Sequence, residues 1–116
     1  MDTIKTLVIE PLRRPELRDI DPSITAIGET IGGYAEPLPL DRRTTLWCDE
    51  EGAIKNLKPN RTIRLSQDSR LADAGKPIII RGTFVITGPH PQDGPLGLDD
   101  EQIGRYAAMF ADPEAP

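Results

Sequence analysis

The segment from Pro77 to Thr87 limits most strongly what this chain can fold into. It is a near-continuous apolar run that holds Ile78, Ile79, Ile80, Phe84, Val85 and Ile86. A half-buried strand would alternate apolar with polar side chains, whereas an unbroken run of β-branched residues is typical of a strand that is buried on both faces. We therefore expect a central strand here, with Gly82 marking a bulge.

Turn residues and β-branched residues predict two hairpins and one edge strand. The first hairpin joins residues 3–9 to residues 16–20, and its second strand is expected at an edge. The second hairpin joins residues 44–48 to residues 53–57 through a turn that begins with Asp49 and ends with Gly52. Residues 34–40 are extended but contain two prolines, which cannot donate to a neighbouring strand, so this segment is also expected at an edge.

A first helix is expected after Asp21-Pro22, which supply a capping side chain and a preset φ. Its apolar stripe consists of Ile24, Ile27 and Ile31. Gly32 or Gly33 should end it in a left-handed conformation, because glycine adopts positive φ without a steric penalty.

A second helix is expected to begin at Asp99, with Gln102 completing a capping box, and to run to about Phe110 before Pro113. Its buried face should consist of Ile103, Tyr106, Ala107 and Phe110. A helix that is capped in this way and carries an apolar stripe is expected to pack on the sheet as part of the core.

These elements predict one α+β domain over residues 1–116: an antiparallel-rich mixed sheet of about five strands with two helices packed on one face. A chain of 116 residues can bury roughly two-thirds of its unfolded surface, so it needs no metal or disulfide to fold. Residues 88–97 are expected to form a flexible Pro/Gly loop, and residues 111–116 a disordered tail. Residues 65–77 are polar and irregular, and the sequence predicts no element that spans them.

Charge and composition exclude several functions. The net charge is −5, from 19 acidic and 14 basic residues, and 4% of residues are aromatic. We therefore do not expect nucleic acid as a partner, because binding it needs a basic face and stacking side chains. Residues 1–5 do not resemble a leader, and no apolar run reaches the length of a membrane span, so we expect a protein of the host cell's cytoplasm without a membrane partner.

The residues that often carry chemistry have ordinary structural explanations here. Cys48 is the only cysteine and is expected to be a small buried hydrophobe. His90 lies between two prolines, where nothing would orient a catalytic base. The acidic run that begins at Asp49 offers three adjacent carboxylates without the organised spacing of a calcium site, and it suits a turn. We expect no catalytic residue, no metal site and no cofactor.

Basic residues between Lys55 and Arg64 form the best candidate binding site in an acidic chain. The candidate binding residues are Lys58, Asn60, Arg61 and Arg64, joined by Trp47 if its ring is exposed. The alternatives remain open. The basic residues can belong to a solvated loop in which Asn60 shapes a turn, Arg61 can be buried and bonded to backbone carbonyls, and Trp47 can belong to the core.

Several of these motifs occur in one order that resembles a known family. They are Gly32-Gly33-Tyr34, residues 46–52, Pro59-Asn60-Arg61, Gly82-x-Phe84 and the helix from Asp99 to Tyr106. In this order the chain resembles domain of unknown function 3846, over nearly its whole length. It departs from the pattern at residues 67–77 and 88–97. The resemblance implies a small protein of bacteriophages, plasmids or bacteria, and implies nothing about catalysis.

The expected function is that of a non-enzymatic accessory protein of a phage or other mobile element, which acts by binding a host or viral protein. The alternative is a binder that sequesters an anionic metabolite or nucleotide signal through Lys58, Arg61 and Arg64. A third interpretation is a minor enzyme whose site is completed across a homodimer, the simplest homo-oligomer. That interpretation needs converging ionisable groups, which the sequence does not display.

Overall fold

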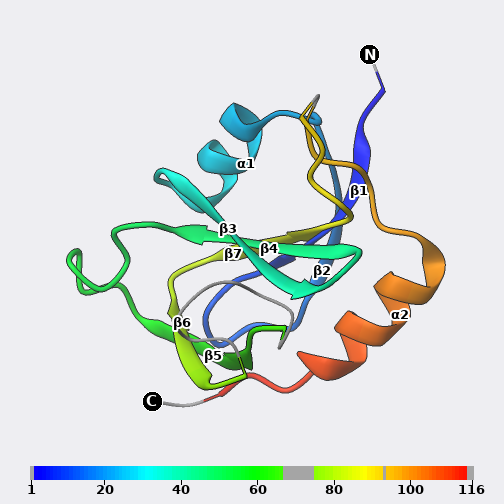
Figure 1. Cartoon of the computed structure of the whole chain (residues 1–116). Helices are drawn as coiled ribbons and strands as arrows, with labels where there is room; N and C mark the ends of the chain where they lie inside the picture. The colour runs from blue at the N-terminus through cyan, green and yellow to red at the C-terminus, as the bar shows by residue number, and fades with distance from the viewer. Residues whose placement is uncertain (1, 67–74, 93, 115–116) are drawn as a thin grey trace.

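A five-stranded antiparallel sheet forms the centre of the fold (Figure 1). The computed structural model describes residues 2–66, 75–92 and 94–114. The strands of this sheet, in spatial order, are β2 (Glu16–Ile20), β1 (Ile4–Ile9), β7 (Phe84–Thr87), β4 (Thr44–Asp49) and β3 (Ala35–Asp41). A second sheet pairs β5 (Pro59–Arg64) with β6 (Pro77–Arg81), and the helices are α1 (Ile24–Ile31) and α2 (Asp100–Met109). The predicted α+β class is confirmed.

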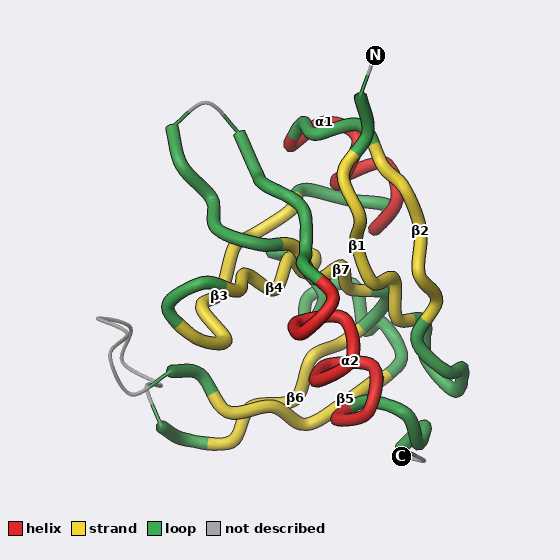
Figure 2. The backbone as a smooth tube through the Cα atoms, turned by 90° about the vertical axis from the view of Figure 1, so that its right-hand side faces the viewer, coloured by secondary structure: helices red, strands yellow, loops and turns green. Residues whose placement is uncertain are grey.

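The two helices cover opposite faces of the five-stranded sheet. Ile27 of α1 packs in a cluster with Val8, Trp47 and Val85. Tyr106 of α2 packs in a second cluster with the side chains that alternate with these along the strands, namely Leu7, Ile9, Leu46, Phe84 and Ile86. The prediction that both helices pack on one face is therefore wrong, because β1, β4 and β7 are apolar on both faces and each face needs its own cover. The two helices lie apart in both views (Figures 1 and 2).

The apolar run at residues 77–87 forms two strands in two sheets. Gly82 lies between them with φ +79°, and a Cβ at this position would lie 2.8 Å from Leu57 Cδ1. All four residues of β7 are buried between β1 and β4, as predicted for a central strand. The part before Gly82 was predicted wrongly, because it pairs with β5 and exposes 59% of Ile79.

The predicted hairpin between residues 44–48 and 53–57 is wrong. β4 instead pairs with β3 and β7. The Asp49 carboxylate accepts the Glu51 N–H at 2.8 Å and binds Lys55 Nζ at 2.9 Å, which holds the following residues in turns. The β1–β2 hairpin and the edge position of β3 are confirmed.

Local capping chemistry sets the helix ends. The N-cap of α1 is Ser23, whose Oγ accepts the Ala26 N–H at 3.1 Å, in place of the predicted Asp21. Gly32 ends this helix with φ 87°, as predicted. Asp99 and Gln102 form the predicted capping box of α2.

The chain around residues 88–97 folds back on itself. Gly88 N–H donates to Leu96 O at 2.8 Å, and Leu96 N–H donates to Pro89 O at 2.9 Å. After α2, Glu114 lies against β5 and binds Thr62. Residues 93 and 115–116, and residues 67–74 of the segment without a predicted element, lie outside the described residues.

Candidate functional site

Asn60 and Arg61, the centre of the predicted basic patch, are both buried. The exposed fraction of each is 1%, because an irregularity between Pro59 and Arg61 interrupts the alternation of β5 and places both residues inside. Asn60 Nδ2 donates to Ile9 O at 2.9 Å and to Gly82 O at 2.8 Å. Asn60 therefore connects β5 to the end of β1 and to the glycine that separates β6 from β7.

Arg61 uses its guanidinium to connect three parts of the fold. Nη2 donates to Arg13 O at 2.6 Å and to Phe110 O at 2.9 Å, and Nη1 donates to Asn60 Oδ1 at 2.8 Å. Burial lowers the pKa of Arg61 below its ordinary value. These contacts match the alternative in which Arg61 is buried and bonded to backbone carbonyls. Its side chain holds the β1–β2 turn against the end of α2.

The other predicted binding residues do not gather into one site. Lys58 and Arg64 are exposed, and Arg64 Nη1 donates to Gly75 O at 2.8 Å. Trp47 has an exposed fraction of 0%, donates to Thr87 Oγ1 at 2.9 Å, and meets the ring of His90 edge-on at 4.7 Å. Trp47 is therefore a core residue and offers no exposed ring to a partner.

A different group of basic residues lines a cavity of about 340 Å³ between the β3–β4 turn and α2. Arg42 and Arg43 come from the turn, and Arg105 comes from α2. Two acids, Asp41 and Glu101, also line the cavity. Sequence reasoning missed this group because the turn and the helix are far apart in the chain. The one local signal is the Asp41-Arg42-Arg43 run, which is typical of a turn with an acid at its first position.

Asp41 fixes the turn that presents Arg42 and Arg43. Its Oδ1 accepts the Arg43 N–H at 2.7 Å, and its Oδ2 accepts a hydrogen bond from the Tyr106 hydroxyl. Burial disfavours the charged carboxylate, but the hydrogen bonds from Tyr106 and from Arg43 outweigh burial and lower the pKa of Asp41. Burial and the bond to Asp41 raise the pKa of Tyr106 to about 12. Asp41 therefore stays ionised and Tyr106 stays protonated at neutral pH.

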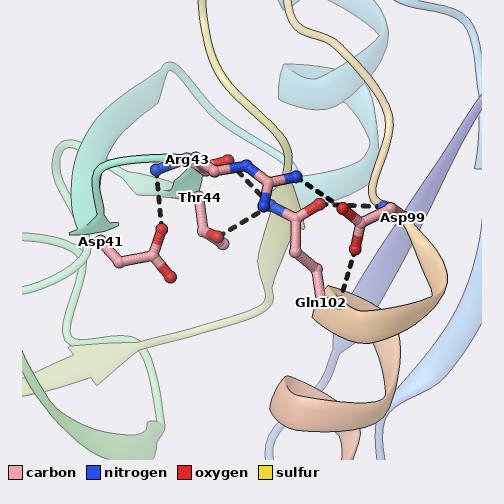
Figure 3. A network of polar contacts seen from close by, with 5 residues as sticks. All are labelled: Asp41, Arg43, Thr44, Asp99 and Gln102. Carbon is pink, nitrogen blue, oxygen red and sulfur yellow. Dashed lines mark hydrogen bonds and ion pairs between the residues drawn. The ribbon is translucent and has the colours of Figure 1, made fainter.

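The capping box of α2 locks this turn to the helix (Figure 3). Gln102 Nε2 donates to Arg43 O at 2.8 Å and to Thr44 Oγ1 at 3.0 Å, while its Oε1 accepts the Asp99 N–H at 2.9 Å. Asp99 Oδ2 in turn accepts from Arg43 Nη2 at 2.6 Å. The wall of the cavity is therefore held by side chains that already have partners, and Gln102 itself is buried.

The arrangement suits the binding of an anionic group. A guanidinium presents several N–H donors in a planar fork, which matches the oxygens of a carboxylate or a phosphate. Arg105 stands over the Tyr106 ring, with 5.6 Å from its Cζ to the ring centroid, so the ring supports the guanidinium that lines the cavity from the helix side.

The Cys48 thiol and the possible metal-binding groups were the remaining candidates for chemistry. Burial, helped by Glu36 and Asp49, raises the pKa of Cys48 to about 12, so the thiolate does not form at neutral pH. Residues 2–66, 75–92 and 94–114 contain no group of three or more His, Cys, Asp or Glu side chains placed to hold a metal ion. In the same ranges no helix is long and apolar enough to cross a membrane.

Comparison with known proteins identifies the family. No curated protein and no solved structure matches the chain significantly. The model of domain of unknown function 3846 matches residues 4–111, which is nearly the whole chain. The chain therefore belongs to the family of domain of unknown function 3846.

Proposed function

We propose that this protein is a non-enzymatic binding protein that holds an anionic group of a small ligand in the cavity between the β3–β4 turn and α2. One observation carries the proposal: Arg42, Arg43 and Arg105 line one cavity in a chain whose net charge is −5. A cluster of cations in an acidic protein concentrates positive potential at one place, which favours an anion there. The volume of about 340 Å³ lies within the range of small-molecule sites.

The acids of the cavity do not cancel this attraction. Both oxygens of Asp41 already accept hydrogen bonds, from Arg43 N–H and from the Tyr106 hydroxyl. Three guanidinium groups and two carboxylates line the cavity, and Arg43 also pairs with Asp99 at 2.6 Å. The excess of positive charge is therefore small, and the planar N–H donors of the guanidiniums carry the attraction for an anion. Glu101 remains exposed to water, which screens its repulsion.

The cavity is also organised before a ligand arrives. The contacts of Gln102 with Arg43 and Thr44, and of Tyr106 with Asp41, fix the wall without the ligand. A ligand therefore meets donors on ordered backbone and avoids part of the entropic cost of ordering a loop.

The proposal is tested by calorimetric titration of the full chain with inorganic phosphate and with a nucleoside monophosphate. Arg105→Ala should weaken binding about 10-fold, because a hydrogen bond to a charged group contributes about 1.5 to 3 kcal/mol and part of this is lost to water at an exposed site. The matched control is Arg14→Ala, which removes the same charge from an exposed position between β1 and β2. Equal weakening by both variants would mean that only net charge matters, and this would refute the site. Absence of binding by the natural chain would refute the proposal for these anions.

A second candidate function is favoured by a separate observation, the unpaired outer edge of β5 described below. In this alternative the protein is an accessory protein of a phage or other mobile element and binds a host or viral protein. For either function we expect it to act in the cytoplasm of the host bacterium, where such a ligand or partner is available.

A further inference from the structure

The outer edge of β5 already binds a carboxylate from the protein's own chain. Thr62 N–H donates to both oxygens of Glu114, at 3.2 and 3.0 Å, and Thr62 Oγ1 donates to Glu114 Oε1 at 3.1 Å. Both residues are exposed. Among the described strands β5 pairs only with β6, so these donors lie on its unpaired side.

A cavity of about 400 Å³ lies beside this edge, between β5 and α2. Its walls are formed by apolar side chains that include Leu40, Ile63 and Phe110, and the cations Arg64 and Arg105 stand among them. Thr62 and Glu114 also line it, so the bound carboxylate lies at the cavity itself. This combination offers backbone donors for an extended chain, apolar surface for its side chains and positive charge for an acid.

We propose that the outer edge of β5 docks an extended segment of a partner protein, and that a carboxylate of this segment replaces Glu114 on Thr62. The proposal rests on the second proposed function, protein binding, and names its surface and the chemistry of its partner. Glu114 acts as a tethered competitor that occupies the site when the partner is absent. We expect the segment to be acidic, because the site now holds the Glu114 carboxylate and because Arg64 and Arg105 line the cavity beside it.

Strand geometry explains why the segment should be extended. In an antiparallel pair, successive residues direct their N–H groups alternately toward and away from the partner strand. Because Thr62 N–H points at Glu114, Arg64 N–H also points outward and Ile63 N–H points toward β6. An unpaired edge with this pattern accepts an added strand, and side-chain pockets then give specificity.

The first experiment uses a short blocked peptide of alternating threonine and valine with one central glutamate, titrated into the full ¹⁵N-labelled chain. The variant Glu114→Ala removes the competitor, and we expect it to bind the peptide about 3-fold to 10-fold more tightly than the natural chain, since a tethered group competes at millimolar effective concentration. The matched control is Glu29→Ala, which removes the same charge from an exposed position on α1. The peptide should shift the amide signals of Thr62 and Arg64 more than that of Ile63.

Three outcomes would overturn the proposal. The peptide fails to bind the Glu114→Ala chain, or it binds the Glu114→Ala and Glu29→Ala chains equally well, or a peptide with glutamine in place of glutamate binds as tightly. The last result would show that the edge does not recognise a carboxylate.

A second experiment tests whether a partner protein binds at the β5 edge or at another surface. Arg64→Pro removes the outward N–H and blocks strand addition, while proline remains tolerated at a strand edge. A melting temperature close to that of the natural chain confirms that this variant folds. Loss of peptide binding by the folded variant supports the proposal. If a protein captured by the natural chain is held equally well by Arg64→Pro, the β5 edge is refuted as its site while protein binding stands.

Discussion

Replacing Arg61 by alanine should destabilise the fold strongly, because its guanidinium makes hydrogen bonds of 2.9 Å or less to three carbonyl oxygens. Two of these acceptors, Phe110 O and Asn60 Oδ1, are in buried hydrogen bonds, at 2.9 and 2.8 Å. The third, Arg13 O, is only partly buried, so water can replace its donor. The effect on stability should therefore come mainly from the two buried acceptors.

The magnitude follows from the cost of an unpaired buried polar group, about 1 to 3 kcal/mol each, so we expect Arg61→Ala to lower the free energy of unfolding by about 2 to 6 kcal/mol. Removing the buried charge returns part of its desolvation cost, which places the expected value toward the lower half of this range. Urea unfolding followed by circular dichroism measures this change, provided that the slope of the free energy of unfolding against urea concentration is the same for both proteins.

The control is Arg64→Ala, on the same strand, whose side chain is exposed and donates to Gly75 O. It should change the free energy of unfolding by less than about 1 kcal/mol. If Arg61→Ala costs no more than Arg64→Ala, the guanidinium does not brace the fold, and the interpretation of Arg61 as structural is refuted.

Two further predictions concern the ends of the helices. Phe110→Ala should cost about 3 to 5 kcal/mol in a thermal or urea melt, because Phe110 is 3% exposed and packs edge-on against Phe84 at 5.5 Å; an unchanged melt would show that α2 does not belong to the core. Gly32→Ala should cost about 1 kcal/mol, since only the positive φ is strained and its Cβ would meet open space. Gly33→Ala should cost more, about 1 to 3 kcal/mol, because its Cβ would lie 2.4 Å from Asp49 Oδ2. In an Asp49→Ala background this order should reverse, because the clash at Gly33 is then removed and only Gly32 has a positive φ.

Elements that depend on local chemistry were predictable from the sequence. The left-handed stop at Gly32 and the capping pair Asp99 and Gln102 are set by residues a few positions apart, and the structure confirms them. The pairing of β4 was not predictable, because the sequence has a turn on each side of this strand. Only tertiary contacts decide that β4 forms its hairpin with β3, through the turn that holds Arg42 and Arg43. The break at Gly82 was also missed as a change of sheet, since a glycine in an apolar run signals a bulge equally well.

The candidate site was less predictable than the fold. The sequence groups Arg61 with the basic residues between Lys55 and Arg64 and leaves open whether it is buried, because the irregularity next to Pro59 that buries it leaves no trace in the residue pattern. The cavity at the β3–β4 turn joins Arg105 to Arg42 and Arg43, which only the packing of α2 brings together. The turn can be predicted from the sequence, but the helix that packs against it cannot.

The central position of β7 has a consequence for how the chain can assemble during synthesis. β7 is the last strand in the sequence, and it lies between β1 and β4, which do not pair with each other. A nascent chain that has not yet released residues 84–87 from the ribosome can form the β1–β2 and β3–β4 hairpins, but it has nothing to join them. Closure of the core therefore waits for contacts between distant parts of the sequence, which makes folding slow relative to a helical protein of similar size. Until then the inner edges of both hairpins remain open, and this is the stage at which the chain is most prone to aggregate.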